Sequence, residues 1–156
     1  MANFYQDVDL QGRVRLEHRN KEGKLLNTRQ FKNVVTVSGR FVAASLLVGT
    51  TATNATFIGL ASGLTLITSS MNSLLGEYTL AGAGLTRTSA TVSVVQPTSA
   101  RWVFTWTCGS DNMPVASECI GHTVSTASIL CAAQSFASIT LNSGDTLQCT
   151  HDISFN

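Results

Sequence analysis

Histidine and cysteine are the residue types of this chain that could bind a metal or act as nucleophiles. They are scattered along the sequence, as His18, His122, His151, Cys108, Cys119, Cys131 and Cys149. Metal sites usually gather their ligands at neighbouring positions of one element, and the cysteines, spaced 11, 12 and 18 residues apart, form no CxxC pair. The spacing therefore predicts no metal site and no cofactor.

Two short-range pairs come closest to a reactive arrangement. Cys119 and His122 are three residues apart, and His151 is adjacent to Asp152. Side chains alternate between the two faces of a strand, so odd spacings place the members of both pairs on opposite faces. The chain also lacks GxSxG, HExxH and P-loop motifs, and its nine acidic residues form no pair suited to glycoside hydrolysis. We therefore expect no catalytic residue and no enzymatic activity.

The four cysteines are then expected to be buried thiols, packed as small apolar groups in a reducing cytoplasm. A disulfide formed after release from the cell is the alternative. No basic start followed by an apolar run opens the chain, and no 18-residue apolar stretch could span a membrane. These features predict synthesis and assembly in a cytoplasm, away from membranes.

The composition points to a surface that is poor in charge. Charged residues make up 12% of the chain, about half of the roughly 25% usual for soluble domains. Serine and threonine, with 17 and 20 residues, fill much of the gap. Such a surface suits packing against other protein, whereas an isolated small enzyme normally keeps more charge. The composition favours self-association, and a β-rich monomer is the alternative.

The charge is distributed unevenly. Residues 1–40 hold eight of the ten lysines and arginines with four acids, for a net charge of +4, whereas residues 41–156 carry −3. The first segment could form a mildly basic face, although a solvated hairpin with paired charges is the preferred interpretation. The overall charge of +1 predicts no nucleic-acid partner.

Alternating polar and apolar residues predict an antiparallel sheet in the first part of the chain. Residues 12–19 and 24–32 form a hairpin around a turn in which Gly23 is free to adopt positive φ. Residues 55–61 are a short apolar strand buried on both faces.

The spacing changes to that of a helix over residues 38–48. Ser38 is expected to cap its start and Gly49 to end it. The predicted stripe against the sheet consists of Phe41, Val42, Ser45 and Leu46.

The second half of the chain is predicted to be entirely β. The expected strands cover residues 87–95, 100–108, 116–124, 126–133, 136–141 and 145–155. Trp102, Phe104 and Trp106 share one strand face and are expected in the core, with a ligand-stacking platform as the alternative. The fold class is therefore all-β, an antiparallel, jelly-roll-like β-sandwich with one short α-helix, comprising an arm over 1–10 and a single domain over 11–156.

Two segments are candidates for contacts with neighbouring subunits. The arm over 1–10, which is either a clasp or a first edge strand, carries Phe4 and Tyr5. Residues 62–84 are too long and too apolar for a free linker, and one helical turn is expected over 71–75. The predicted interface residues of this segment are Leu64, Leu66, Ile67, Met71, Leu74 and Leu75.

Several short motifs resemble those of small virion structural proteins of tailed bacteriophages. They are the segments KNVVT at 32–36, FIGLASG at 57–63, LTR at 85–87 and ITLNSGDTL at 139–147, in this order around the short helix. The resemblance spans nearly the whole chain and carries no catalytic residue. The four cysteines and the apolar segment 62–84 depart from the common pattern.

The resemblance implies a capsid decoration protein that staples the head shell. Its partners would be copies of itself, as a homotrimer or ring, and the major capsid protein, and it would be located in the virion after assembly in the bacterial cytoplasm. A tail, collar or fibre-attachment component with neighbouring tail proteins as partners is the alternative. A third alternative is a carbohydrate-binding β-sandwich that uses an exposed Trp102 or Trp106.

Overall fold

The structure is a computed structural model that describes residues 9–47, 49, 54–64, 66–79, 83–95, 98–122 and 130–155. In chain order its elements are β1 (Leu10–Arg19), β2 (Leu25–Val35), α1 (Val37–Leu47), β3 (Phe57–Ala61), β4 (Thr88–Ser89), β5 (Thr91–Val95), β6 (Ser99–Thr107), β7 (Met113–Gly121), β8 (Leu130–Leu141) and β9 (Thr146–Phe155). Antiparallel pairing joins the nine strands in the order β4-β3-β7-β8-β2-β1-β9-β6-β5.

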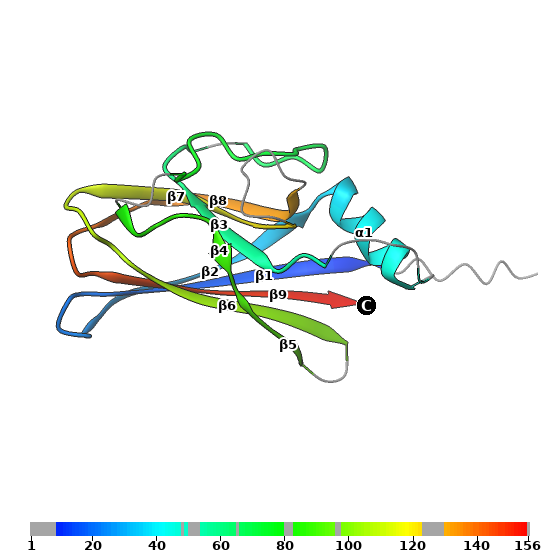
Figure 1. Ribbon diagram of the computed structural model, residues 1–156, viewed down its shortest axis with the longest axis horizontal. Helices are drawn as coiled ribbons and strands as arrows, with labels where there is room; N and C mark the ends of the chain where they lie inside the picture. The colour runs from blue at the N-terminus through cyan, green and yellow to red at the C-terminus, as the bar shows by residue number, and fades with distance from the viewer. Residues whose placement is uncertain are drawn as a thin grey trace, which may run out of the picture.

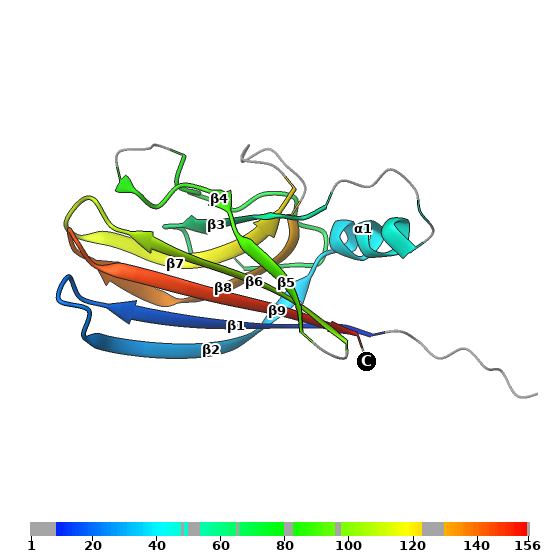
Figure 2. The same cartoon turned by 60° about the horizontal axis from the view of Figure 1, so that its bottom comes forward.

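The sheet curls until it almost closes on itself. The strands at its two ends, β4 and β5, follow each other in the chain and are separated by Ala90 alone. Figures 1 and 2 show the two halves of the sheet facing each other, with α1 at one end of the molecule. The predicted all-β class with one short helix is confirmed. The two predicted layers correspond to the two halves of one nearly closed sheet, and the jelly-roll topology stays a prediction.

The core lies between these halves. One half contributes inward side chains from β1, β6 and β9, and the other half contributes those of β3, β7 and β8. The buried members include Val14, Leu16, Trp106, Leu147, Ile58, Leu60, Val115, Ile139 and Leu141. A stacked pair, Phe31 and Phe136, with ring centroids 5.4 Å apart, joins β2 to β8 where the two strands diverge.

The hairpin of β1 and β2 follows the predicted alternation. Val14, Leu16 and His18 are buried on one face of β1, and the intervening residues are exposed or half-buried. Gly23 has a φ of 81° in the connecting turn, as predicted. Gly12 is also required, because a Cβ there would overlap the side chain of Asn33, its partner on β2.

The helix is confirmed, but its cap and its buried stripe differ from the prediction. Thr36, and not Ser38, caps α1: its Oγ1 accepts the N–H of Gly39 at 3.0 Å. Thr36 is held by β8, since its own N–H donates to Cys131 O at 3.0 Å, so the helix begins as soon as the chain leaves β2. Gly49, with a φ of 70°, follows the helix end as expected.

Close approach at Gly39 sets the buried face of α1. A Cβ at this position would collide with the backbone of Cys131, so the helix lies directly against β8 there. Val42 and Ser45, three and six residues later, are buried on the same face. Phe41 and Leu46 were predicted on this stripe, but they are 71% and 45% exposed.

The β7–β8 region corrects the predicted strand breaks. Residues 126–133 and 136–141 were expected to form separate strands, whereas β8 runs without interruption over Leu130–Leu141. The alternation of buried and exposed residues is interrupted in β8 because a bulge shifts its pairing with β7 between Val115 and Ser117. In contrast, the predicted strand over 87–95 is divided at Ala90, whose N–H donates to Thr56 O at 2.8 Å.

The predicted arm falls mostly outside the described residues, which exclude Phe4 and Tyr5. Leu10 was assigned to the arm, but it opens β1 and pairs with Phe155 of β9. Among the described residues, no helix has the length and apolarity needed to cross a membrane.

Candidate functional site

The described residues 62–64 and 66–76 belong to a loop whose two ends meet. The N–H of Ser62 donates to Gly76 O at 3.0 Å, and the N–H of Tyr78 donates to Leu60 O at 3.0 Å. Gly76 has a φ of 69°, a conformation that glycine adopts without strain. A compact loop with joined ends is an Ω-loop, so this segment is a fixed part of the surface. The helical turn predicted over 71–75 is replaced by a turn in which the N–H of Met71 donates to Thr68 O.

The six predicted interface residues of this loop divide into two groups. Three hold the loop on the body: Leu74, which is 6% exposed, together with Ile67 and Met71, which pack against Ala61, Cys119, Leu130 and Ala133. Three face outward: Leu64, Leu66 and Leu75, with exposed fractions of 71%, 85% and 68%. Because Leu74, Ile67 and Met71 anchor the loop, the outward-facing leucines have defined positions.

The start of α1 lies beside this loop and also exposes apolar side chains. The N–H of Val37 donates to Ser69 O at 2.7 Å, which joins the helix to the loop. Val37 and Phe41, one helical turn apart, are 62% and 71% exposed. We name the set of five side chains the association surface: Leu64, Leu66, Leu75, Val37 and Phe41.

A basic groove of about 530 Å³ crosses the outer face of β2, β1, β9 and β6. Its lining residues are Arg13, Val14, Arg15, Gln30, Phe31, Lys32, Arg101, Thr150 and Asp152. Arg101 forms an ion pair with Asp152 through two hydrogen bonds of 2.7 and 2.9 Å. Within the described part of the chain, Arg13 and Lys32, which face each other across β1 and β2, contact no carboxylate. Arg15 pairs with Glu17 at 2.6 Å, so the paired charges preferred from the sequence are present, and Arg13 and Lys32 leave the groove with net positive charge.

A buried ion pair fixes the base of the Ω-loop, and sequence reasoning missed it. Arg87 Nε and Nη2 donate to the two carboxylate oxygens of Glu77 at 2.6 and 2.8 Å, and both side chains are almost fully buried. Arg87 Nη2 also lies 3.5 Å from Cys119 Sγ. Gly59 provides the space for this pair, because a Cβ there would come within 2.7 Å of Glu77 Oε1.

A second buried group joins the two halves of the sheet through His151. Its Nδ1 lies 3.0 Å from Glu118 Oε2, with both side chains fully buried, and its Nε2 contacts Asn33 Nδ2. An amide nitrogen can only donate, so Nε2 accepts the hydrogen bond of Asn33 and Nδ1 donates one to Glu118 Oε2. Glu118 Oε1 has no hydrogen-bond partner within the described structure. This group ties β9 to β7 and β2.

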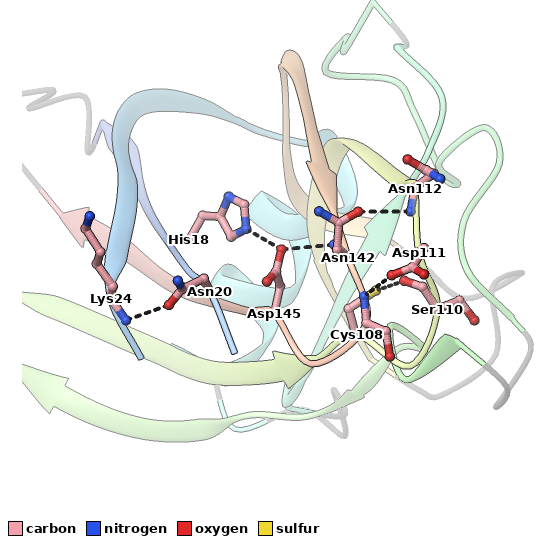
Figure 3. A network of polar contacts seen from close by, with 10 residues as sticks. His18, Asn20, Lys24, Cys108, Ser110, Asp111, Asn112, Asn142 and Asp145 are labelled. Carbon is pink, nitrogen blue, oxygen red and sulfur yellow. Dashed lines mark hydrogen bonds and ion pairs between the residues drawn. The ribbon is translucent and has the colours of Figure 1, made fainter. Parts of the chain in front are cut away.

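A third pair lies where three turns meet, at the end of the molecule opposite α1. His18 Nε2 lies 3.0 Å from Asp145 Oδ2, which also accepts the N–H of Asn142 at 2.9 Å (Figure 3). In the same network, Asp111 accepts the N–H of Ser143 at 2.9 Å. The carbonyl of Asp145 accepts the N–H of Cys108 at 2.8 Å, so Asp145 joins the β8–β9 turn both to β1 and to the chain that follows β6.

Asp145 makes the stability of the fold depend on pH. Burial alone would raise the pKa of Asp145, but the N–H of Asn142 and the His18 ring hold it below its ordinary value of 3.8. The stabilisation is therefore present above pH 3.8 and is lost as the pH falls through the folded-state pKa. We expect the urea midpoint to fall between pH 5 and pH 3, and to fall less in an Asp145→Asn variant. Equal losses in both proteins would contradict this role.

The four cysteines are buried free thiols, as predicted. Burial raises the pKa of the Cys131 thiol to about 12 and also raises the pKa values of the Cys119 and Cys149 thiols well above their ordinary value. Thiols with raised pKa values carry almost no thiolate at neutral pH, so they are poor nucleophiles. Among the described residues, no three His, Cys, Asp or Glu side chains gather as metal ligands.

The aromatic stripe belongs to the core, as predicted. Trp102 and Trp106 are 8% and 2% exposed, and their Nε1–H groups donate to Ala55 O and Thr86 O. This burial leaves the carbohydrate-binding interpretation without a stacking platform.

No family model, no curated protein and no solved structure matches this chain. Its function is therefore inferred from the association surface, the basic groove and the buried pairs that position them.

Proposed function

We propose that this chain is a non-enzymatic structural subunit that assembles with copies of itself. The observation that carries the proposal is the association surface, on which Leu64, Leu66 and Leu75 are 68–85% exposed. Single exposed apolar residues are ordinary, but three large ones on one loop and two on the helix hydrogen-bonded to that loop suit a protein contact.

The loop is held in place independently of any partner. Leu74 is buried below it, the Arg87–Glu77 pair fixes its base, and the hydrogen bonds between Ser62 and Gly76 close its neck. A preformed surface loses little conformational entropy on binding. Full burial of a leucine side chain is worth about 2 kcal/mol, so covering three of them offsets much of the cost of association.

The basic groove supports contact with a different, acidic neighbour. It carries four cationic side chains and one acidic one, so the same groove on two copies would repel. An acidic protein surface would complement it. This agrees with the virion class that the motifs resemble, in which a capsid decoration protein contacts both its own copies and the major capsid protein. A tail or collar component is the second position within that class.

The outward leucines can be tested by a triple variant, Leu64→Ser, Leu66→Ser and Leu75→Ser. We expect it to remain folded, since all three side chains are exposed, and to have a lower mass in solution than the wild type by light scattering. The matched control is Leu25→Ser with Leu26→Ser, because these leucines are 45% and 52% exposed at the far end of the hairpin. A triple variant that assembles like the wild type would contradict the assigned surface.

The location is tested by immunogold electron microscopy of purified phage particles that encode this chain. Label over the whole shell supports a decoration protein, and label confined to the tail supports the tail component. Particles that contain none of the chain would rule out the virion assignment and leave self-assembly to be judged by mass alone.

A further inference from the structure

The outer edge of β5 is unpaired. β5 forms a ladder with β6 from Thr91 to Val95, and it stands at the end of the strand order. Within the described part of the chain, no other strand pairs with its outer side. Its first four residues are exposed on both faces, and Figure 1 shows β5 at the margin opposite the Ω-loop. Alternate backbone N–H and C=O groups of an edge strand point outward and can bind a further strand.

A stretch of β2, inside the strand order, shows how this chain protects a strand whose outer side is unpaired. β2 joins β8 only at Val34 and Val35, so its outer side is also free over residues 25–33. That stretch carries Arg29 and Lys32, and charged side chains discourage pairing with another strand. β5, with the sequence TVSVV, has no charge and no proline. Its edge therefore lacks the protection that β2 has.

Two valines of β5 lie uncovered on the core-facing side of the sheet. Val92 pairs with the buried Trp102, and Val94 pairs with Ala100, so all four share that side. The valines are nevertheless 44% and 76% exposed, because the core ends at Trp102. Within this one chain, the two valines therefore form an apolar surface on the inner side of an unpaired strand that the other described side chains leave exposed.

We propose that the outer edge of β5 pairs antiparallel with β5 of a second copy, around a two-fold axis at Ser93. This inference rests on the proposed function and assigns one of its contacts. The segment is self-complementary in that register. Val92 of each copy faces Val94 of the other, and Thr91 faces Val95, so two valine pairs form on the core-facing side. The sheets of the two copies become continuous.

The nearest charges do not oppose this contact. Arg101 lies beside Ser93 on the neighbouring strand, and its guanidinium already binds Asp152 through two hydrogen bonds. Across the two-fold axis, the two Arg101 side chains are separated by three strand spacings, about 14 Å. This exceeds the screening length of about 8 Å at physiological salt, so their repulsion is weak.

A second surface on the same subunit extends the assembly. In Figure 1 the Ω-loop and β5 lie at opposite margins of the molecule. A two-fold contact at β5 closes a pair of copies, and contacts through the association surface can then link such pairs into a larger structure.

A thiol introduced at the axis tests the pairing directly. In a Ser93→Cys variant, the new thiols of the two copies would face each other at a Cα separation of about 4.5–5.5 Å, which suits a disulfide. The four native cysteines are buried, so the introduced thiol is the accessible one. We expect a disulfide-linked dimer after mild oxidation at low protein concentration, and none for Thr28→Cys, an exposed position on β2. Absence of the linked dimer in the Ser93→Cys variant would overturn the pairing.

A charge on the edge provides the second arm of the test. Val94→Lys should at least halve the mass of the assembled species in solution, because the two lysines of a β5 pair would enter an apolar contact. The control is Thr105→Lys, an exposed position on β6 beyond the end of β5. If the wild type assembles and Val94→Lys assembles equally well, the β5 contact is wrong and the proposed function stands. If the wild type itself remains monomeric at high concentration, the proposed function fails first.

Discussion

Replacing Arg87 by methionine is expected to lower the free energy of unfolding by about 3–5 kcal/mol. Glu77 would then remain in a site that is almost completely closed to water, without the two hydrogen bonds of 2.6 and 2.8 Å that now compensate its burial. Removing one partner of a buried pair leaves the full desolvation cost of the other. Urea unfolding followed by tryptophan fluorescence measures the loss.

The double variant Arg87→Met with Glu77→Leu is the control. Replacing both charges by apolar side chains removes the desolvation cost, so this protein should regain most of the lost stability. If the Arg87→Met variant lost less than about 1 kcal/mol, or if the double variant were no more stable than the single one, the pair would not have the role assigned to it. Because Glu77 follows the neck of the Ω-loop, the single variant should also weaken assembly.

Replacing His151 by phenylalanine is expected to cost about 3 kcal/mol. The ring would still fill the space between the halves of the sheet, but Glu118 Oε2 would lose its donor while Oε1 already has none. Asn33 Nδ2 would lose its acceptor as well. The same urea measurement applies, and the loss comes from two newly unsatisfied polar atoms, Glu118 Oε2 and Asn33 Nδ2, and not from a cavity.

Glu118→Gln separates the charge from the hydrogen bond at this site. The amide oxygen can still accept the hydrogen bond that His151 Nδ1 donates, so we expect Glu118→Gln to cost less stability than His151→Phe. If Glu118→Gln were as damaging as His151→Phe, the geometry described for this group would be wrong. If His151→Phe were as stable as the wild type, the group would have no structural role.

Alternation predicted much of the sheet, because a strand with one buried face repeats every two residues. β1 and β9 show this best. Val14, Leu16 and His18 occupy the buried face of the strand predicted over 12–19, and Leu147, Cys149 and His151 follow the same pattern on β9. That last pattern was a usable signal that His151 faces inward. It did not identify Glu118 as its partner, because the two residues are 33 positions apart in the chain.

Long-range contacts account for most of what the sequence did not reveal. Thr36 caps α1 in place of the predicted Ser38 because a hydrogen bond to β8 holds Thr36 at the start of the helix. The close contact between Gly39 and the backbone of Cys131 determines which face of α1 is buried. The Arg87–Glu77 pair had one local signal, an arginine in a stretch that is otherwise uncharged. Only the folded chain shows that this arginine points inward to meet the end of the Ω-loop.

The candidate interface was predicted in part. Apolar composition identified residues 62–84, but it could not distinguish anchoring side chains such as Leu74 from outward ones such as Leu66. That distinction depends on which side of the loop meets the buried Ala61 and Cys119. The exposed valines of β5 were missed for a related reason. Alternation indicates which face of a strand is apolar. It does not show whether core side chains cover that face, and on β5 they do not.

Sedimentation of the wild-type chain over a hundredfold range of concentration tests the central claim most directly. A subunit that covers its low-charge surface with copies of itself should sediment as a species heavier than the 16.6 kDa monomer, and dilution should dissociate it reversibly. A single 16.6 kDa species at every concentration would contradict the account.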